Sequence, residues 1–314
     1  LHPSISHISI LLLSSVKEEK PGLQSPVDSG MLIENSFWRC VVNLFTPIET
    51  VENYAAAGVA KTQAPAWRLL MLGILAGFLI AMGGAVTNTA GHSIANVGLC
   101  RLVSGLLFPF GLAMVILTGA ELFTGNTLLF LSVLNQRTSA ARMLRNWGLV
   151  YLGNFAGALA VAAGCAFSGQ MDYSAGGLAV FTIKAAAGKC ALTFGNAVLL
   201  GLFCNVLVTL GVLLSLTGQD LTGRVLGAYL PVAFFVICGF EHSIANMFYI
   251  PAGLFARSIP RYAELAARAG LDLTALTWEN FLLRNLLPVT LGNILGGMAV
   301  ALVFWLCHLR GKSG

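Results

Sequence analysis

Long apolar runs separated by short polar segments dominate the chain after its first 45 residues. Each is long enough to cross a membrane, for which about 20 apolar residues suffice. We predict six spans, at Trp67–Val86, Leu102–Leu131, Trp147–Phe167, Leu192–Leu216, Val225–Ala256 and Phe281–Leu306. The composition agrees, since 57% of the residues are hydrophobic and only 10% are charged, which is outside the usual range of soluble domains. The chain is therefore expected to be an all-α integral membrane protein.

Two of these runs, Leu102–Leu131 and Val225–Ala256, are too long for one uninterrupted crossing. Each contains a single charged residue, Glu121 in the first and Glu241 in the second. Backbone groups freed by a helix break cannot face lipid, so they must find partners inside the protein. We therefore predict that helices 2 and 5 are broken near these glutamates and that the breaks form a site.

The two breaks carry the same motif, which indicates an internal repeat. Gly119–Asn126 and Gly239–Asn246 both read Gly-x-Glu-x-x-x-x-Asn, and the pair Asn146 and Asn154 is matched at the same spacing by Asn285 and Asn293. Three spans per repeat is an odd number, so the second copy must enter the membrane upside down. This predicts a 3+3 inverted repeat, in which half-helix N-termini meet near the midplane and attract anions.

The charged and polar residues of the breaks have two readings each. Glu121 and Glu241 are expected to accept hydrogen bonds from backbone N–H groups that the breaks leave unpaired, with direct proton or ion handling as the alternative. His242 has only Leu122 as its counterpart in the first motif. An imidazole can exchange a proton near neutral pH, so His242 is a candidate functional residue, the alternative being a buried structural histidine.

Other candidates lie in or beside the spans. Lys189 is expected to begin the fourth span, either as an interfacial lysine or as an attractor of anions at a pore mouth. Asn205 lies within that span, with Val208 one turn further on the same face, and it must face a neighbouring helix or a pore. Phe108 and Leu112 share a face of the second span; alone, they indicate only packing.

Sequence signals outside the spans bound the domains. We expect residues 1–45 to be a disordered extension and residues 46–312 to be the membrane domain, with repeats at about 67–168 and 190–308. Thr46-Pro47-Ile48-Glu49 is typical of a capping box and predicts a helix along the membrane surface. The excess of Lys and Arg on the amino-terminal side of the membrane favours cytoplasmic termini in a cell membrane.

The two joined motifs resemble those of the formate/nitrite transporter family. They read Gly-Phe-Glu-His-Ser-Ile-Ala-Asn-Met at 239–247 and Gly-Ala-Glu-Leu-Phe-Thr-Gly-Asn at 119–126, and the likeness extends from about Thr46 to Arg310. The resemblance implies a homopentamer of aquaporin-like six-helix protomers, each with its own pore. It implies permeation of a small monovalent anion or its weak acid, coupled to protons, with formate first and nitrite or hydrosulfide as alternatives. Glu121 stands where formate channels commonly have Asp, which leaves the substrate open.

The resemblance also implies roles by position. His242 would be the central pore histidine, Thr124 its partner or a substrate contact, and Lys189 the vestibule lysine. The implied outer constriction is formed by Phe108, Asn205 and Phe235, and the inner one by Leu112, Leu122, Phe123 and Val208; Asn246 belongs to the substrate pathway. A bare anion crosses apolar constrictions only at high cost, so the implied mechanism is recruitment of the anion followed by its protonation as the dielectric falls.

Two other classes of membrane protein would fit parts of the pattern. An aquaporin-type channel for neutral solutes should carry Asn-Pro-Ala at both breaks, and neither break contains proline. An integral-membrane enzyme would need a metal constellation or an activated nucleophile. The sequence offers one intramembrane histidine, no Gly-x-Ser-x-Gly and seven cysteines without a Cys-x-x-Cys pair, so neither catalysis nor a cofactor is expected.

Overall fold

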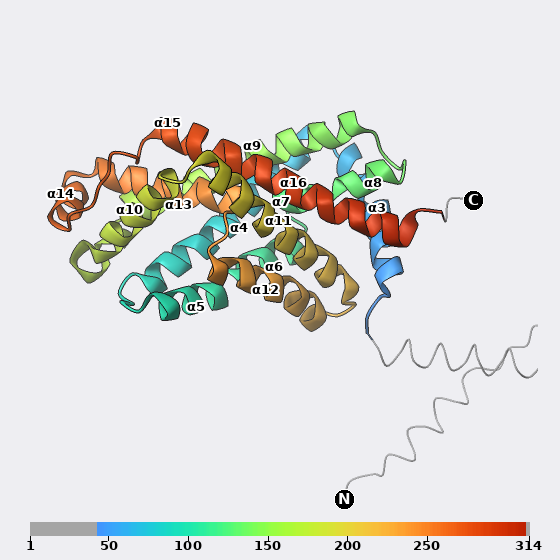
Figure 1. Ribbon diagram of the computed structural model, residues 1–314, viewed down its shortest axis with the longest axis horizontal. Coiled ribbons are helices and arrows are strands. Elements are labelled where there is room, and N and C mark those ends of the chain that lie inside the picture. The colour runs from blue at the N-terminus through green and yellow to red at the C-terminus, as the bar shows by residue number, and fades with distance from the viewer. Residues whose placement is uncertain (1–42, 312–314) are drawn as a thin grey trace, which may run out of the picture. The chain divides into compact units, whose positions relative to one another are not determined.

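The computed structural model describes residues 43–311, and this part of the chain is helical apart from an isolated bridge between Leu44 and Gly218. The expected extension over residues 1–45 lies almost wholly outside it. The helices are α3 (Pro47–Gln63), α4 (Ala66–Gly91), α5 (Val97–Leu107), α6 (Pro109–Thr118), α7 (Phe123–Asn126), α8 (Leu129–Leu134), α9 (Ala140–Phe167), η2 (Gln170–Gly176), α10 (Gly177–Cys190), α11 (Phe194–Thr217), α12 (Leu221–Cys238), α13 (Ser243–Ser258), α14 (Pro260–Arg268), α15 (Trp278–Asn280), η3 (Phe281–Leu286), α16 (Leu287–Phe304) and η4 (Trp305–Leu309) (Figure 1).

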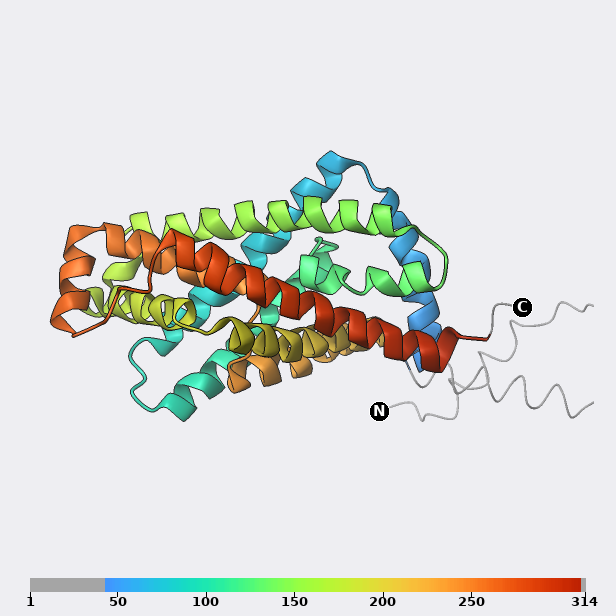
Figure 2. The ribbon, with the colours of Figure 1, turned by 45° about the horizontal axis from the view of Figure 1, so that its top comes forward.

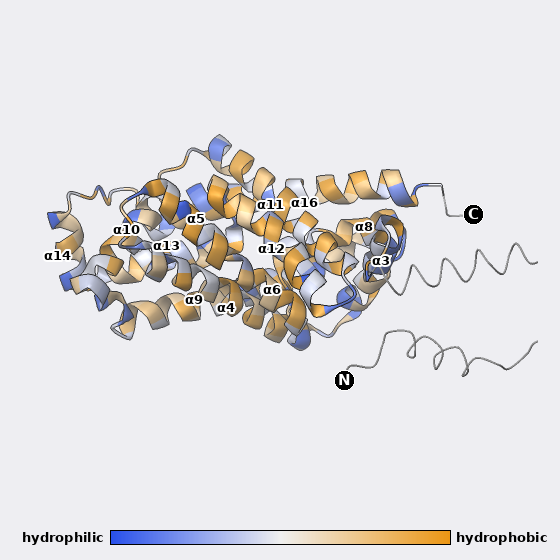
Figure 3. Cartoon of the chain, turned by 90° about the horizontal axis from the view of Figure 1, so that it is seen from below, coloured by the Kyte–Doolittle hydropathy of each residue, from blue (hydrophilic) through white to orange (hydrophobic). Residues whose placement is uncertain are grey.

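Six helical segments of the described chain are long and apolar enough to cross a membrane, as predicted. They are Ala66–Gly91, Val97–Thr118, Ala140–Phe167, Phe194–Thr217, Leu221–Cys238 and Trp278–Leu309. Large apolar side chains such as Phe78, Phe110 and Phe203 are exposed on their outer faces, and hydrophilic residues gather at the ends of the bundle, for example on α14 (Figure 3). Such a surface is suited to lipid rather than water, so the chain is a multi-pass membrane protein.

Both helix breaks are present. Helix α6 ends at Thr118 and is followed by Gly119 with φ 68°, while α12 ends at Cys238 and is followed by Gly239 with φ 73°. Glycine adopts this left-handed conformation without the steric penalty that a Cβ brings. The chain restarts as α7 and α8 in the first repeat but as the single helix α13 in the second.

The second halves of the two broken helices run towards opposite ends of the bundle. Helix α8 lies at the end where α3 is found, and α13 lies at the end that holds α10 and α14 (Figures 1 and 2). Opposite directions are what an inverted repeat requires. The fold is therefore the predicted six-span, 3+3 inverted repeat with broken helices 2 and 5.

The packing of the long helices is also duplicated. Helix α4 packs along α9, and α11 packs along α16. A Cβ at Gly157 would collide with the carbonyl oxygen of Ile74, and a Cβ at Gly296 would collide with that of Leu202. These helix pairs therefore approach backbone to backbone, as small residues allow in membrane helices.

One predicted boundary was wrong. Lys189 does not begin the fourth span, because it lies in the last turn of α10 and the span itself begins at Phe194 in α11. Helix α10 has 14 residues, too few to cross a bilayer, and its Ala- and Gly-rich sequence did not stand out as a separate element. By contrast, α3 begins with the predicted capping box, in which Thr46 and Glu49 bond reciprocally.

Candidate functional site: the two breaks and the vestibule

Each break holds a glutamate in an ion pair with a lysine. Glu121 accepts hydrogen bonds from Lys61 Nζ at 2.8 Å and from Asn126 Nδ2 at 2.6 Å. Glu241 accepts them in the same way from Lys189 Nζ at 2.7 Å and Asn246 Nδ2 at 2.6 Å. The expectation that these carboxylates bind unpaired backbone N–H groups was therefore wrong. The sequence did not single out Lys61. The one feature that could have pointed to it is its position, because Lys61, like Lys189, lies in the last turn of a helix that precedes a span.

Asparagines, not glutamates, satisfy the backbone groups freed by the breaks. Asn154 Oδ1 accepts from the Phe123 N–H, and its Nδ2 donates to the carbonyl oxygens of Glu121 and Gly73. Asn293 makes the equivalent three bonds, to the Ser243 N–H and to the carbonyl oxygens of Glu241 and Gly201. The sequence marked these asparagines as repeat markers, and the structure shows why a break needs them: an unpaired backbone group in the bilayer costs several kcal/mol.

His242 joins the two breaks. Its Nδ1 accepts a hydrogen bond from the Ala245 N–H at 3.1 Å, and its Nε2 lies 2.8 Å from Thr124 Oγ1. A nitrogen that accepts carries no proton, so this hydrogen-bond pattern assigns the neutral ring with its proton on Nε2, which donates to Thr124. Protonation of Nδ1 would break the cap at the start of α13. The first repeat has no such contact.

Aromatic rings close one side of His242. The Phe235 ring stacks on the imidazole with centroids 5.8 Å apart, and Phe108 meets Phe235 edge to face at the same separation. All three side chains are buried. The two phenylalanine rings form an apolar barrier beside His242, in the lining of a cavity.

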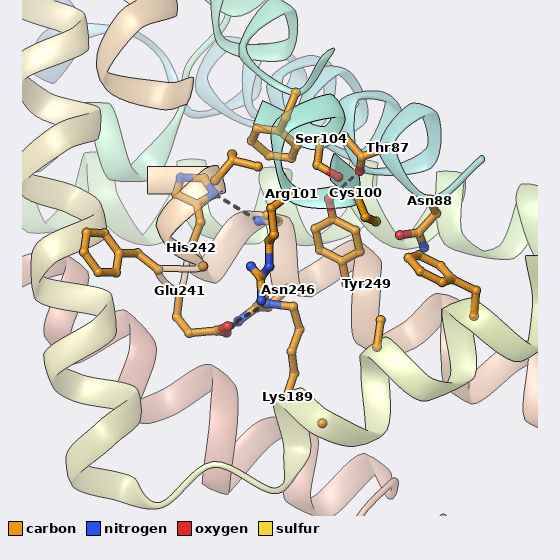
Figure 4. Close-up of a pocket in the computed structure, with 18 of the residues that line it drawn as sticks. Thr87, Asn88, Cys100, Arg101, Ser104, Lys189, Glu241, His242, Asn246 and Tyr249 are labelled. Carbon is orange, nitrogen blue, oxygen red and sulfur yellow. Dashed lines mark hydrogen bonds and ion pairs between the residues drawn. The ribbon is translucent and has the colours of Figure 1, made fainter. Parts of the chain in front are cut away.

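This cavity, which we call the vestibule, has a volume of about 740 Å³ and is partly open. The charged and central polar groups that line it are Arg101, Lys184, Lys189, Glu241, His242 and Asn246. Figure 4 shows Arg101 reaching down from α5 towards Asn246, Lys189 and Glu241. The Oδ1 atom of Asn246 is buried without a partner in the part of the chain described. The lining of the vestibule therefore includes three cations and one carboxylate besides the histidine.

The remaining candidate residues lie deeper. Asn205 is fully buried, and its Nδ2 donates to the carbonyl oxygen of Asn293 at 2.6 Å and to Thr127 Oγ1 at 3.0 Å, so it faces neighbouring elements. The residues assigned to the inner constriction share one buried core with Phe108 and Phe235 and do not line the vestibule; they are Leu112, Leu122, Phe123 and Val208. The Phe123 ring packs edge-on against Trp147 and Tyr151 of α9.

The described residues contain no cluster of three or more His, Cys, Asp or Glu side chains suited to a metal ion. Two broken helices meet at a single polar centre beneath a cation-lined mouth, inside six membrane spans. That arrangement defines a membrane channel or transporter.

Comparison with known proteins gives the family. Residues 48–306 match the model of the family described as formate/nitrite transporter, and the chain belongs to that family, which transports solutes and is not enzymatic. It is 37% identical to a probable formate transporter of Methanothermobacter thermautotrophicus, over 84% of this chain and 97% of the relative. It is 35% identical to the formate channel FocA of Escherichia coli K12, over 85% and 96% of the two chains. A solved pentameric formate channel with formate bound superposes with a TM-score of 0.69 at 34% identity, covering 78% of this chain and 98% of the other.

Proposed function

We propose that this protein conducts formate, and similar small monovalent anions or their weak acids, across a cell membrane together with protons. The observation that carries the proposal is the vestibule, which is lined by Arg101, Lys184 and Lys189 and ends on His242 beneath Phe108 and Phe235. The similarity to proteins named formate channels supports formate as the first substrate. Nitrite and hydrosulfide are the alternatives.

The geometry suggests how a weak acid passes. The cations of the vestibule concentrate the anion, and the surrounding apolar walls favour its protonated form because burial penalises charge. The neutral acid then crosses the apolar residues around Phe108 and Phe235. At the centre, the Nε2–H of His242 and the hydroxyl of Thr124 offer the acid a hydrogen bond in place of water. In this mechanism His242 stays neutral, because α13 uses its Nδ1 as a cap.

The assembly and orientation belong to the same proposal. The superposition on a pentameric channel supports a homopentamer with one pore in each protomer. The distribution of Lys and Arg supports cytoplasmic termini, which would place the vestibule on the outer side. Phe108, Asn205 and Phe235 would then form the outer constriction, and Leu112, Leu122, Phe123 and Val208 the inner one.

Uptake by reconstituted protein tests the function. Proteoliposomes should accumulate labelled formate faster than liposomes without protein. An inward proton gradient should increase this uptake. The formate recovered from the proteoliposomes should be chemically unchanged. Parallel assays with nitrite and hydrosulfide rank the substrates. Uptake of glycerol without any of these anions would contradict the proposal and favour a channel for neutral solutes.

A further inference from the structure

The family resemblance assigns anion attraction to Lys189, but the structure places that lysine in an ion pair. Its Nζ lies 2.7 Å from Glu241 Oε1, and the side chains are only 22% and 7% exposed. The Nζ also lies 5.5 Å from the centre of the Tyr249 ring. A paired lysine and glutamate have no net charge, so their attraction for an anion falls off steeply with distance. Lys189 therefore serves mainly to hold Glu241 at the second break.

Arg101, like Lys184, is a cation of the vestibule that has no such partner among the described residues. Within residues 43–311 its guanidinium makes no hydrogen bond or salt bridge, yet it points into the cavity rather than away from it (Figure 4). It lies against the second break, because a Cβ at Gly239 would stand 2.5 Å from Arg101 Nη1. Gly119, the counterpart of Gly239, has open space at the same position. Gly239 thus provides both the turn and the room for the guanidinium.

We infer that Arg101, assisted by Lys184, is the anion-recruiting group of the vestibule and favours planar oxoanions such as formate. The inference rests on the proposed function. Unpaired cations in a concave site with low-dielectric walls focus the potential and raise the local concentration of anions. A guanidinium also presents two parallel N–H groups that match a carboxylate, whereas a lysine acts as a point charge. Hydrosulfide offers no second acceptor atom and gains only the charge attraction.

Kinetics of the intact channel in proteoliposomes test this role. With Arg101→Gln, the formate concentration for half-maximal flux should rise roughly fivefold, while maximal flux changes little. This half-saturation concentration should also become less sensitive to added salt. Lys184→Gln should give a smaller rise, about twofold. Arg101→Lys should have nearly the wild-type formate concentration for half-maximal flux, but a lower preference for formate over hydrosulfide. Arg268→Gln is the matched control, since it removes one positive charge from α14, at the same end but outside the vestibule.

The outcomes separate the two proposals. If wild-type protein conducts formate and Arg101→Gln keeps the wild-type half-saturation, or shifts it no more than Arg268→Gln, the inference is wrong and the proposed function stands. If wild-type protein conducts no formate, the proposed function itself fails. Size-exclusion profiles verify assembly of each variant, and should Arg101→Gln not assemble, unchanged selectivity in Arg101→Lys would be enough to reject the inference.

Discussion

The two breaks share their scaffold and differ at the centre. In both, a lysine and an asparagine hold the glutamate, and a second asparagine ties down the freed backbone. The polar residues that meet in the middle are not duplicated: Thr124, Asn205 and His242 have Ile244, Gly77 and Leu122 as their counterparts. Symmetry therefore solves the problem of breaking a helix in a membrane, and the departures from symmetry provide a polar centre for a permeating acid.

The glutamate sites also differ in one detail. Lys61 bonds to both Glu121 Oε1 and Asn126 Oδ1, at 2.8 and 3.3 Å. Lys189 bonds only to Glu241, and Asn246 Oδ1 is left without a partner among the described residues. The second break thus keeps an unused acceptor facing the vestibule, whereas the first is closed by its own lysine.

The largest effect should come from the duplicated asparagines. Replacing Asn293 with Leu removes three hydrogen bonds and leaves buried backbone groups unpaired, so we expect a loss of about 3 kcal/mol or more. Asn154→Leu should cost nearly the same, because its bonds are equivalent. Thermal unfolding of the purified assembly measures both, with the exposed Asn196→Leu as a control. A clearly smaller loss for one variant would show that the two breaks are not energetically equivalent.

A smaller effect should separate the glutamates. Glu241→Gln leaves Lys189 without a carboxylate, and a hydrogen bond to a charged group contributes about 1.5–3 kcal/mol. Glu121→Gln should cost about 1 kcal/mol less, because Lys61 keeps Asn126 as a partner. The same unfolding assay ranks them, and the reverse order would refute the importance of that extra bond.

Exchange of the central residue should change transport in addition to removing the cap of α13. His242→Ala removes the Nε2–H donor and its hydrogen bond to Thr124, so formate flux should fall about tenfold. The shape of its pH dependence should not change, because the ring stays neutral in the proposed mechanism. Leu122→Ala, at the equivalent position of the other break, should leave the shape of the pH profile as it is. Flux measured across a range of external pH checks both. A pH profile that changes in His242→Ala would contradict the neutral role given to the ring.

The smallest effect concerns the N-caps of α5 and α12, with which the first halves of the two broken helices begin. Hydrogen bonds from the Gly223 N–H and from Asn43 lower the pKa of Asp220, the cap of α12, below its ordinary value of 3.8. A lowered pKa means that this cap stabilises fully above about pH 4 and that the stabilisation is lost as pH falls through the folded-state pKa. Asn96 caps α5 without a charge, so its contribution should not vary with pH.

Asp220→Asn tests this difference between the repeats. The variant should match the wild type near neutral pH, since Asn and Asp cap about equally well, and should lose less stability on acidification. Unfolding temperatures measured in detergent over the acid range provide the comparison. Identical acid dependence in the two proteins would show that the charge of Asp220 does not matter for α12.

The sequence alone determined much of this fold, because the deciding signals are local. Apolar run lengths predicted six spans, and two lone glutamates in overlong runs predicted the breaks, since hydrocarbon tolerates neither free charges nor free backbone groups. The repeated motif predicted the inversion. The absence of a histidine from the first copy pointed to His242 as the exceptional residue.

Only the tertiary structure decided which groups meet. Lys61 and Glu121, or Asn293 and the Ser243 N–H, lie on segments far apart along the chain, and no local pattern states which side chain will reach a broken backbone. The position of Lys189 on α10 and the unpaired state of Arg101 likewise depend on how helices pack. A sequence encodes the need for a partner through burial, whereas the partner itself is chosen by the distance between elements far apart along the chain.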